Sequence, residues 1–109
     1  MRTLPIFHEA DVELVAGSDI ARVMPTPARA LLREPQLFAK AEVPNSAVIA
    51  SATSRAAEKV GKQAATGTVV VGGIADAVLL DADPVADISY LIDQRHVRAV
   101  VSSGHIVQR

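Results

Sequence analysis

Residues 67–88, GTVVVGGIADAVLLDADPVADI, are the stretch that decides the fold. Two apolar runs, Thr68–Val71 and Ile74–Asp81, are separated by Gly72-Gly73, and glycine supplies the positive φ values that a tight connection needs. The second run is apolar at consecutive positions from Ala77 to Leu80, which is typical of a strand covered on both faces. The stretch therefore predicts a β-hairpin whose second strand is buried.

Helices are predicted on the amino-terminal side of this stretch. One is expected to begin at Pro27, a residue preorganised for the first helical position. Pro35 predicts a break or kink at Glu34, because proline removes a backbone hydrogen bond and clashes with the preceding turn. The clearest helix spans 47–60, where apolar residues recur at three- and four-residue spacing, and Gly61 supplies a left-handed stop.

Further short elements complete an α+β fold class, with a short strand, two to three helices and then β-hairpins. Val12–Ala16 predicts the short buried strand, which is followed by Gly17-Ser18-Asp19. Asp87 is suited to cap a helical turn, and residues 97–101 and 106–107 predict a terminal hairpin.

Composition narrows the class of protein. The 109 residues form one domain or part of one, half of them apolar but with two phenylalanines, one tyrosine and no tryptophan, so the core is made of small side chains. A net charge of -1 gives no basic face for nucleic acid. The absence of cysteine makes a reducing, cytoplasmic compartment the default expectation. No run approaches the ~20 apolar residues of a membrane span, so no membrane partner is expected.

The motifs of the second half resemble the closing segment of the amidohydrolase superfamily. They are similar to the imidazolonepropionase and Xaa-Pro dipeptidase type of metal-dependent hydrolase. The residues that carry the resemblance are Gly67-Thr68-Val69, Gly72, Ala75-Asp76, Val78–Asp81, Asp83-Pro84-Val85, Asp87-Ile88, Val97–Val101 and Gly104–Val107.

The resemblance extends from about residue 10 to the end and implies two parts. Residues 1–66 resemble the end of the catalytic barrel, with one strand and the helices after it. Residues 67–109 resemble part of the small composite β-sandwich beside that barrel.

Asp19 is the candidate site residue. Residues 10–19 are similar to the family's last barrel strand, and the resemblance implies that Asp19 binds the catalytic metal, zinc or a similar divalent ion, or its bridging water. It also implies that Asp19 accepts and relays the proton of the attacking hydroxide. On the residues alone, Asp19 after Gly17-Ser18 is more typical of a helix cap or an Asx-turn residue than of a metal ligand.

Metal binding by this chain alone is not expected. Zinc needs three or four ligands, and the family's other ligands lie on strands that have no counterpart in this sequence. His8, His96 and His105 have no i,i+2 or i,i+4 pairing, so we expect solvated surface histidines. Four aspartates lack the spacing of a calcium loop and are expected to serve turns and caps: Asp76, Asp81, Asp83 and Asp87.

Two hypotheses about function remain open. The first is the C-terminal part of a metal-dependent hydrolase of C–N bonds (non-peptide amides, cyclic amides or dipeptides), inactive as an isolated chain and meeting a small-molecule substrate only when its site is completed. The alternative is a non-catalytic, self-associating α+β module derived from such an enzyme. An exposed strand edge favours pairing, so the expected partner is a second copy or a complementary chain.

Overall fold

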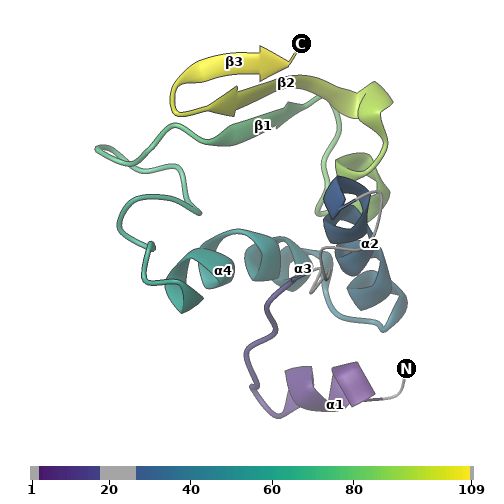
Figure 1. The fold of residues 1–109 in the computed structure, drawn as a ribbon. Coiled ribbons are helices and arrows are strands. Elements are labelled where there is room, and N and C mark those ends of the chain that lie inside the picture. Colours follow the sequence, from purple (N-terminus) through teal and green to yellow (C-terminus); the bar gives the residue numbers. More distant parts are fainter. Residues whose placement is uncertain (1–2, 18–26, 109) are drawn as a thin grey trace.

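The computed structural model describes residues 3–17 and 27–108. The described α-helices all precede the sheet, which confirms the α+β class, and Figure 1 shows the sheet and the helices on opposite sides of the molecule. In chain order the elements are α1 (Thr3–Glu9), α2 (Pro27–Lys40), α3 (Asn45–Ala52), α4 (Ser54–Lys59), β1 (Ala77–Leu80), the 3-10 helices η1 (Ile88–Leu91) and η2 (Gln94–His96), β2 (Val97–Ser102) and β3 (His105–Gln108).

The sheet is antiparallel, in the order β1-β2-β3. Val78 lies opposite Val100, and Ser102 lies opposite His105. The terminal hairpin predicted from the sequence is confirmed. Its connection is Ser103-Gly104, with φ values of 50° and 82°, the two positive values that a type I′ turn requires.

The hairpin predicted between residues 68–71 and 74–81 does not form. The glycine turn is present, since Gly72 has a φ of 84° and the amide of Gly73 donates to the carbonyl of Val70 (3.1 Å). The next amide, that of Ile74, donates instead to the carbonyl of Ala65 (2.7 Å). This bond directs the chain away from residues 68–71, which stay exposed, and β1 pairs with β2.

The prediction that both faces of this strand are covered is wrong for this chain. Val78 and Leu79 point to opposite faces, and their side chains are 53% and 60% exposed. The consecutive apolar residues were the basis of the prediction, and the described part of the chain supplies no cover for either of these two side chains.

Helix α2 continues through Pro35, so the predicted break at Glu34 is wrong. Pro35 is itself buried, and Phe38 on the following turn is one of the most buried apolar residues. Packing of this turn against the core offsets the one backbone hydrogen bond that proline cannot donate.

The helix predicted over 47–60 is divided into α3 and α4 at Thr53, whose φ and ψ are -126° and -94°. The hydroxyl of Thr53 donates to the carbonyl of Ile49 (2.8 Å), a local bond of the kind that competes with helix propagation. Backbone from the later loop also packs here, because a Cβ added to Gly67 would lie 2.8 Å from the carbonyl oxygen of Thr53. Both contacts are specific to this position and explain the division.

The predicted stop at Gly61 is confirmed. Gly61 has a φ of 68°, and its amide donates to the carbonyl of Glu58 (3.0 Å). The amide of Lys62 donates to the carbonyl of Ala57 (2.7 Å). These two bonds form a Schellman motif, which satisfies the last carbonyls of α4.

The predicted strand at Val12–Ala16 is an extended segment without strand pairing. At its start the amide of Val12 donates to the carbonyl of Phe7 in α1 (2.9 Å), and at its end the amide of Ala16 donates to the carbonyl of Ser51 in α3 (3.0 Å). Glu13 forms an ion pair with Lys59 of α4 (2.7 Å). The segment thus lies against helices, because no strand in the described part of the chain is placed to pair with it.

The core is small and lies where the extended segment, α2, α3 and η1 meet. Its cluster of buried residues consists of Leu14, Ala16, Phe38, Val43, Val48 and Ile88. Ile88 enters it from η1, whose cap is Asp87 as predicted: the Asp87 carboxylate accepts from the amide of Ser89 (2.9 Å). None of the described helices is long and apolar enough to cross a membrane.

Candidate functional site

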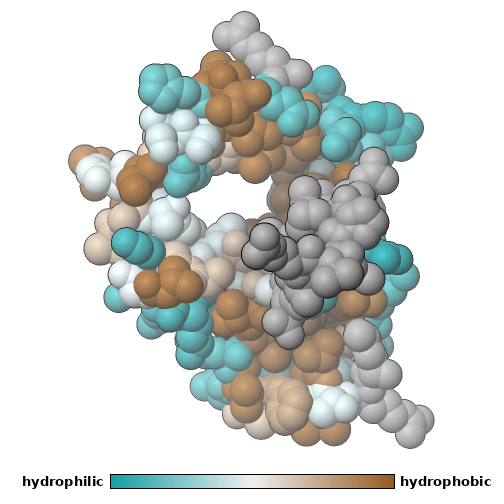
Figure 2. All heavy atoms as spheres, in the orientation of Figure 1, coloured by the Kyte–Doolittle hydropathy of each residue, from teal (hydrophilic) through white to brown (hydrophobic). Residues whose placement is uncertain are grey.

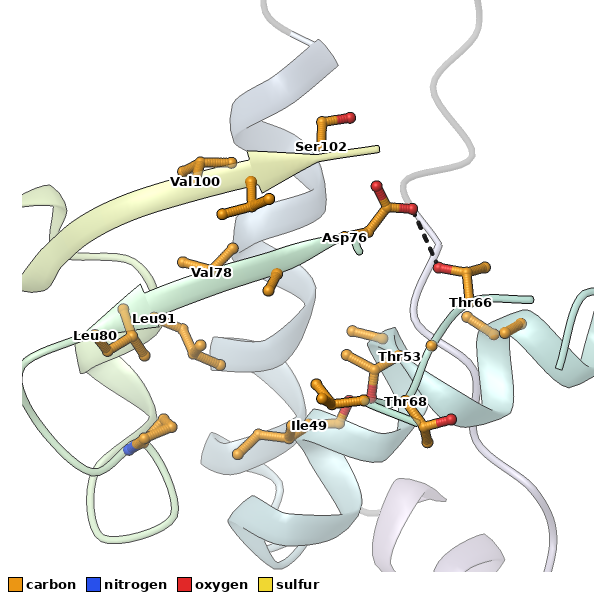
Figure 3. Close-up of a pocket in the computed structure, with 18 of the residues that line it drawn as sticks. Ile49, Thr53, Thr66, Thr68, Asp76, Val78, Leu80, Leu91, Val100 and Ser102 are labelled. Carbon is orange, nitrogen blue, oxygen red and sulfur yellow. Dashed lines mark hydrogen bonds between the residues drawn. The ribbon is translucent and has the colours of Figure 1, made fainter. Parts of the chain in front are cut away.

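An open apolar groove of about 940 Å³ lies between the sheet and helices α3 and α4. Figure 2 shows this hollow in the molecular surface, and Figure 3 shows side chains from both sides of it. Ile49 and Thr53 come from the helical side, and Val78, Leu80 and Val100 come from the sheet. The groove is mostly aliphatic, so its chemistry favours an apolar occupant.

The polar end of the groove is organised by Asp76. One oxygen of its carboxylate accepts from the amide of Ser103 (2.8 Å), and the other accepts from the hydroxyl of Thr66 (3.3 Å), as drawn in Figure 3. The amide of Gly104 donates to the carbonyl of Ala75 (2.9 Å). We call these residues the Asp76 clasp, since they fasten the β2–β3 turn to the loop before β1.

Replacing Asp76 with alanine is expected to lower the free energy of unfolding by about 1–2 kcal/mol, because a charge-assisted bond to a backbone amide is lost. Amide hydrogen exchange at Ser103 should become faster. Thr66→Val is the control, since it removes only the 3.3 Å bond, and a smaller effect is expected. Equal stability of Asp76→Ala and the natural chain would contradict this role.

A second polar cluster surrounds Asp81 at the end of β1. One carboxylate oxygen lies 2.7 Å from Nδ1 of His96, and the other contacts the guanidinium of Arg98. The ring of His96 packs edge-on against Tyr90, with 4.6 Å between centroids. The hydrogen bond from His96, with help from Arg98, lowers the pKa of Asp81. A carboxylate bound by two basic groups is a poor general base. We therefore assign this cluster a structural role at the end of the sheet and not a catalytic one.

The expectation of solvated histidines is confirmed for the exposed His105 and only in part for the other two. His8 is half-buried, and His96 has 32% of its side chain exposed but is bonded to Asp81. His96 and Arg98 are two residues apart, a spacing that places side chains on one face of an extended chain. That spacing was the signal in the sequence that could have indicated a polar cluster at His96 and Arg98. It gave no indication of Asp81 as the partner, because Asp81 is brought there by long-range pairing of β1 with β2.

Acid is expected to destabilise the 3-10 helices η1 and η2, which are capped by Asp87 and Asp93. Hydrogen bonds from Arg95 lower the pKa of Asp93 to about 2, and a hydrogen bond from Ser89 lowers that of Asp87. A carboxylate whose pKa is depressed by folding stabilises the fold above its unfolded pKa of about 3.9, and this contribution is lost as the pH falls toward the folded value. The melting temperature should therefore fall between about pH 4 and 2. Asp93→Asn should make that fall shallower, and an unchanged profile would contradict the assignment.

Asp19, the sequence-predicted catalytic and metal residue, lies outside the described residues. The structure describes the chain up to Gly17, in the segment that Ala16 fixes to Ser51. Among the residues that the structure describes, no three histidine or carboxylate side chains come together as a metal-binding group.

The chain has its α-helices first and its antiparallel sheet after them. Over residues 2–107 the sequence matches the model of the amidohydrolase family, so the chain belongs to that family. This confirms the resemblance inferred from the motifs around Asp76 and Asp81.

Solved structures of hydrolases are similar to this chain over nearly its whole length. A prolidase complexed with N-methylphosphonate-L-proline is 32% identical, with a TM-score of 0.79 over 98% of this chain. An amidohydrolase is 28% identical, with a TM-score of 0.80 over 95% of this chain and 24% of its own. A Xaa-Pro dipeptidase with bound methionine, 24% identical, shares the fold with a TM-score of 0.82, over 98% of this chain and 25% of its own. No curated protein matches. The chain spans about a quarter, 26%, of the length of the prolidase.

Proposed function

We propose that this chain supplies the C-terminal quarter of an amidohydrolase that cleaves C–N bonds, in amides, cyclic amides or dipeptides. The observation that carries the proposal is the alignment of 98% of the chain with 26% of a prolidase at 32% identity. Dipeptides with a proline nitrogen are the first substrate class to test, because that relative is a prolidase.

Asp19 is the residue on which we place the proton transfer. In the completed site its carboxylate accepts a proton from the attacking water and passes it to the leaving nitrogen. The extended segment before it is held by the Ala16–Ser51 bond and the Glu13–Lys59 ion pair. A zinc or similar divalent ion is the expected cofactor of the complete site, and it would polarise the carbonyl or activate the water there.

The experiment compares the isolated chain with a chimera in which the chain replaces the matching quarter of the prolidase. We expect the chimera to hydrolyse a Xaa-Pro dipeptide and the isolated chain to hold no stoichiometric zinc and hydrolyse nothing. Turnover by the isolated chain with bound zinc would overturn the dependence on a completed site. A folded chimera without any turnover would overturn the proposed role in hydrolysis.

The alternative function is a non-catalytic module that works by self-association. The open groove favours it, because aliphatic side chains of β1, α3 and α4 face a hollow that the described residues do not fill. In that case the chain is a homo-oligomer, and hydrolysis by the chimera is absent while association remains.

A further inference from the structure

The extended segment, residues 12–16, is bonded to helices on both sides of the α3–α4 junction. The amide of Ala16 donates to the carbonyl of Ser51 in α3 (3.0 Å). The carboxylate of Glu13 lies 2.7 Å from Nζ of Lys59 in α4. One short segment is therefore attached to two successive helices, so the angle between these helices decides whether both attachments can form at once.

The junction at Thr53 is what makes both attachments possible. In an uninterrupted α-helix the carbonyl of Ser51 would accept from the amide of Arg55, four residues later. Thr53 has a φ of -126° and a ψ of -94°, outside the helical range, and the carbonyl of Ser51 accepts from the amide of Ala16 instead. A continuous helix would also redirect α4 and carry the ammonium group of Lys59 with it. The position of the extended segment thus depends on the junction.

The attachment to α3 is part of the core. Ser51 is fully buried, and its hydroxyl donates to the carbonyl of Val48 (2.6 Å), another fully buried residue. Leu14 and Ala16 of the extended segment belong to the same buried cluster as Val48. A substitution at this attachment would disturb the core as well as the segment, so its effect on turnover would be mixed with unfolding.

The attachment to α4 is exposed and can be removed by itself. The side chains of Lys59 and Glu13 are 54% and 43% exposed. The hydrogen bond from Lys59 lowers the pKa of Glu13, so this carboxylate is charged at neutral pH. An ion pair this exposed contributes little to the stability of a fold. Breaking the pair should therefore release the segment from α4 while the fold persists.

We propose that Glu13 and Lys59 are positioning residues for the proposed hydrolysis. Their ion pair, together with the bond between α3 and Ala16, fixes the segment from which the chain continues to Asp19, three residues after Ala16 in the sequence. Neither side chain has to touch the substrate, because displacing a reacting group by about 1 Å can cost about 10²-fold in rate. The assignment rests on the proposed function, since it concerns the same reaction.

The prolidase chimera tests the assignment, with kcat and KM for a Xaa-Pro dipeptide measured separately. Glu13→Lys and Lys59→Glu should each lower kcat about tenfold and change KM by less than about twofold. The double variant Glu13→Lys/Lys59→Glu restores opposite charges and should recover most of the lost kcat. Glu58→Lys is the matched control: Glu58 is exposed in α4 beside Lys59, and this variant should keep the kcat of the parent.

Amide hydrogen exchange at Ala16 in the isolated chain gives a second readout, which does not depend on activity. Exchange should become faster in both single variants and return toward the natural rate in the double variant, while the melting temperature stays nearly constant. Unchanged exchange, an active chimera whose kcat is indifferent to the pair, or a loss of kcat that the double variant does not rescue would each overturn the assignment alone. A folded parent chimera without turnover would overturn the proposed function, and the assignment with it.

Discussion

Replacing Phe38 with alanine is expected to lower the free energy of unfolding by about 3–5 kcal/mol, the usual cost of deleting a buried phenylalanine. Phe38 is 7% exposed and belongs to the buried cluster with Leu14, Val43 and Val48. It is the largest side chain in that cluster, and its smaller neighbours cannot fill the cavity left behind. Since domains of this size have only about 5–15 kcal/mol of stability in total, much of the cooperative unfolding transition should be lost.

Urea unfolding followed by circular dichroism measures this effect. The control is Phe7→Ala, the other phenylalanine of the chain, which lies in α1 and is 44% exposed. It should change the stability by less than about 1 kcal/mol. Equal shifts of the unfolding midpoint for the two variants would contradict the position of the core.

The second large effect is expected for Gly67→Ala. Gly67 has a φ of 89°, and an added Cβ would lie 2.7 Å from Cβ of Ala57 and 2.8 Å from the carbonyl oxygen of Thr53. The change therefore combines backbone strain with a steric clash against backbone, and we expect a loss of more than about 2 kcal/mol.

Gly72→Ala is the matched control for this substitution. Gly72 has a similar φ of 84°, but nothing lies within 4 Å of its added Cβ, so only strain of about 1–2 kcal/mol is expected. Comparing the thermal unfolding of the two variants separates the cost of backbone strain from the cost of the steric clash. A Gly67→Ala variant as stable as Gly72→Ala would show that the loop does not pack against the α3–α4 junction.

Local signals in the sequence predicted much of the fold. The positive φ of Gly61 and Gly72, the Asp87 cap and the Ser103-Gly104 hairpin each depend on a few neighbouring residues, and each is present. The start of α2 at Pro27 was also predicted from local sequence and is present.

The predictions that proved wrong concern segments whose conformation is determined by long-range contacts. Residues 68–71 have strand propensity, yet the bond from Ile74 to Ala65 and the pairing of β1 with β2 leave them unpaired. Pro35 disfavours a helix locally, yet core packing carries α2 through it. The partners of Asp76 and Asp81 likewise come from residues far along the chain, so no spacing rule revealed them.

We propose that Asp19 transfers the proton in the completed hydrolase, and the chimera with the prolidase provides the test. The measurement is kcat for hydrolysis of a Xaa-Pro dipeptide by the chimera and two asparagine variants. Asp19→Asn should reduce kcat about 10²–10⁴-fold, the range for losing a positioned general acid–base group. Asp11→Asn, the same charge change in a turn after α1, should leave kcat unchanged. An Asp19→Asn chimera as fast as its parent would contradict the claim.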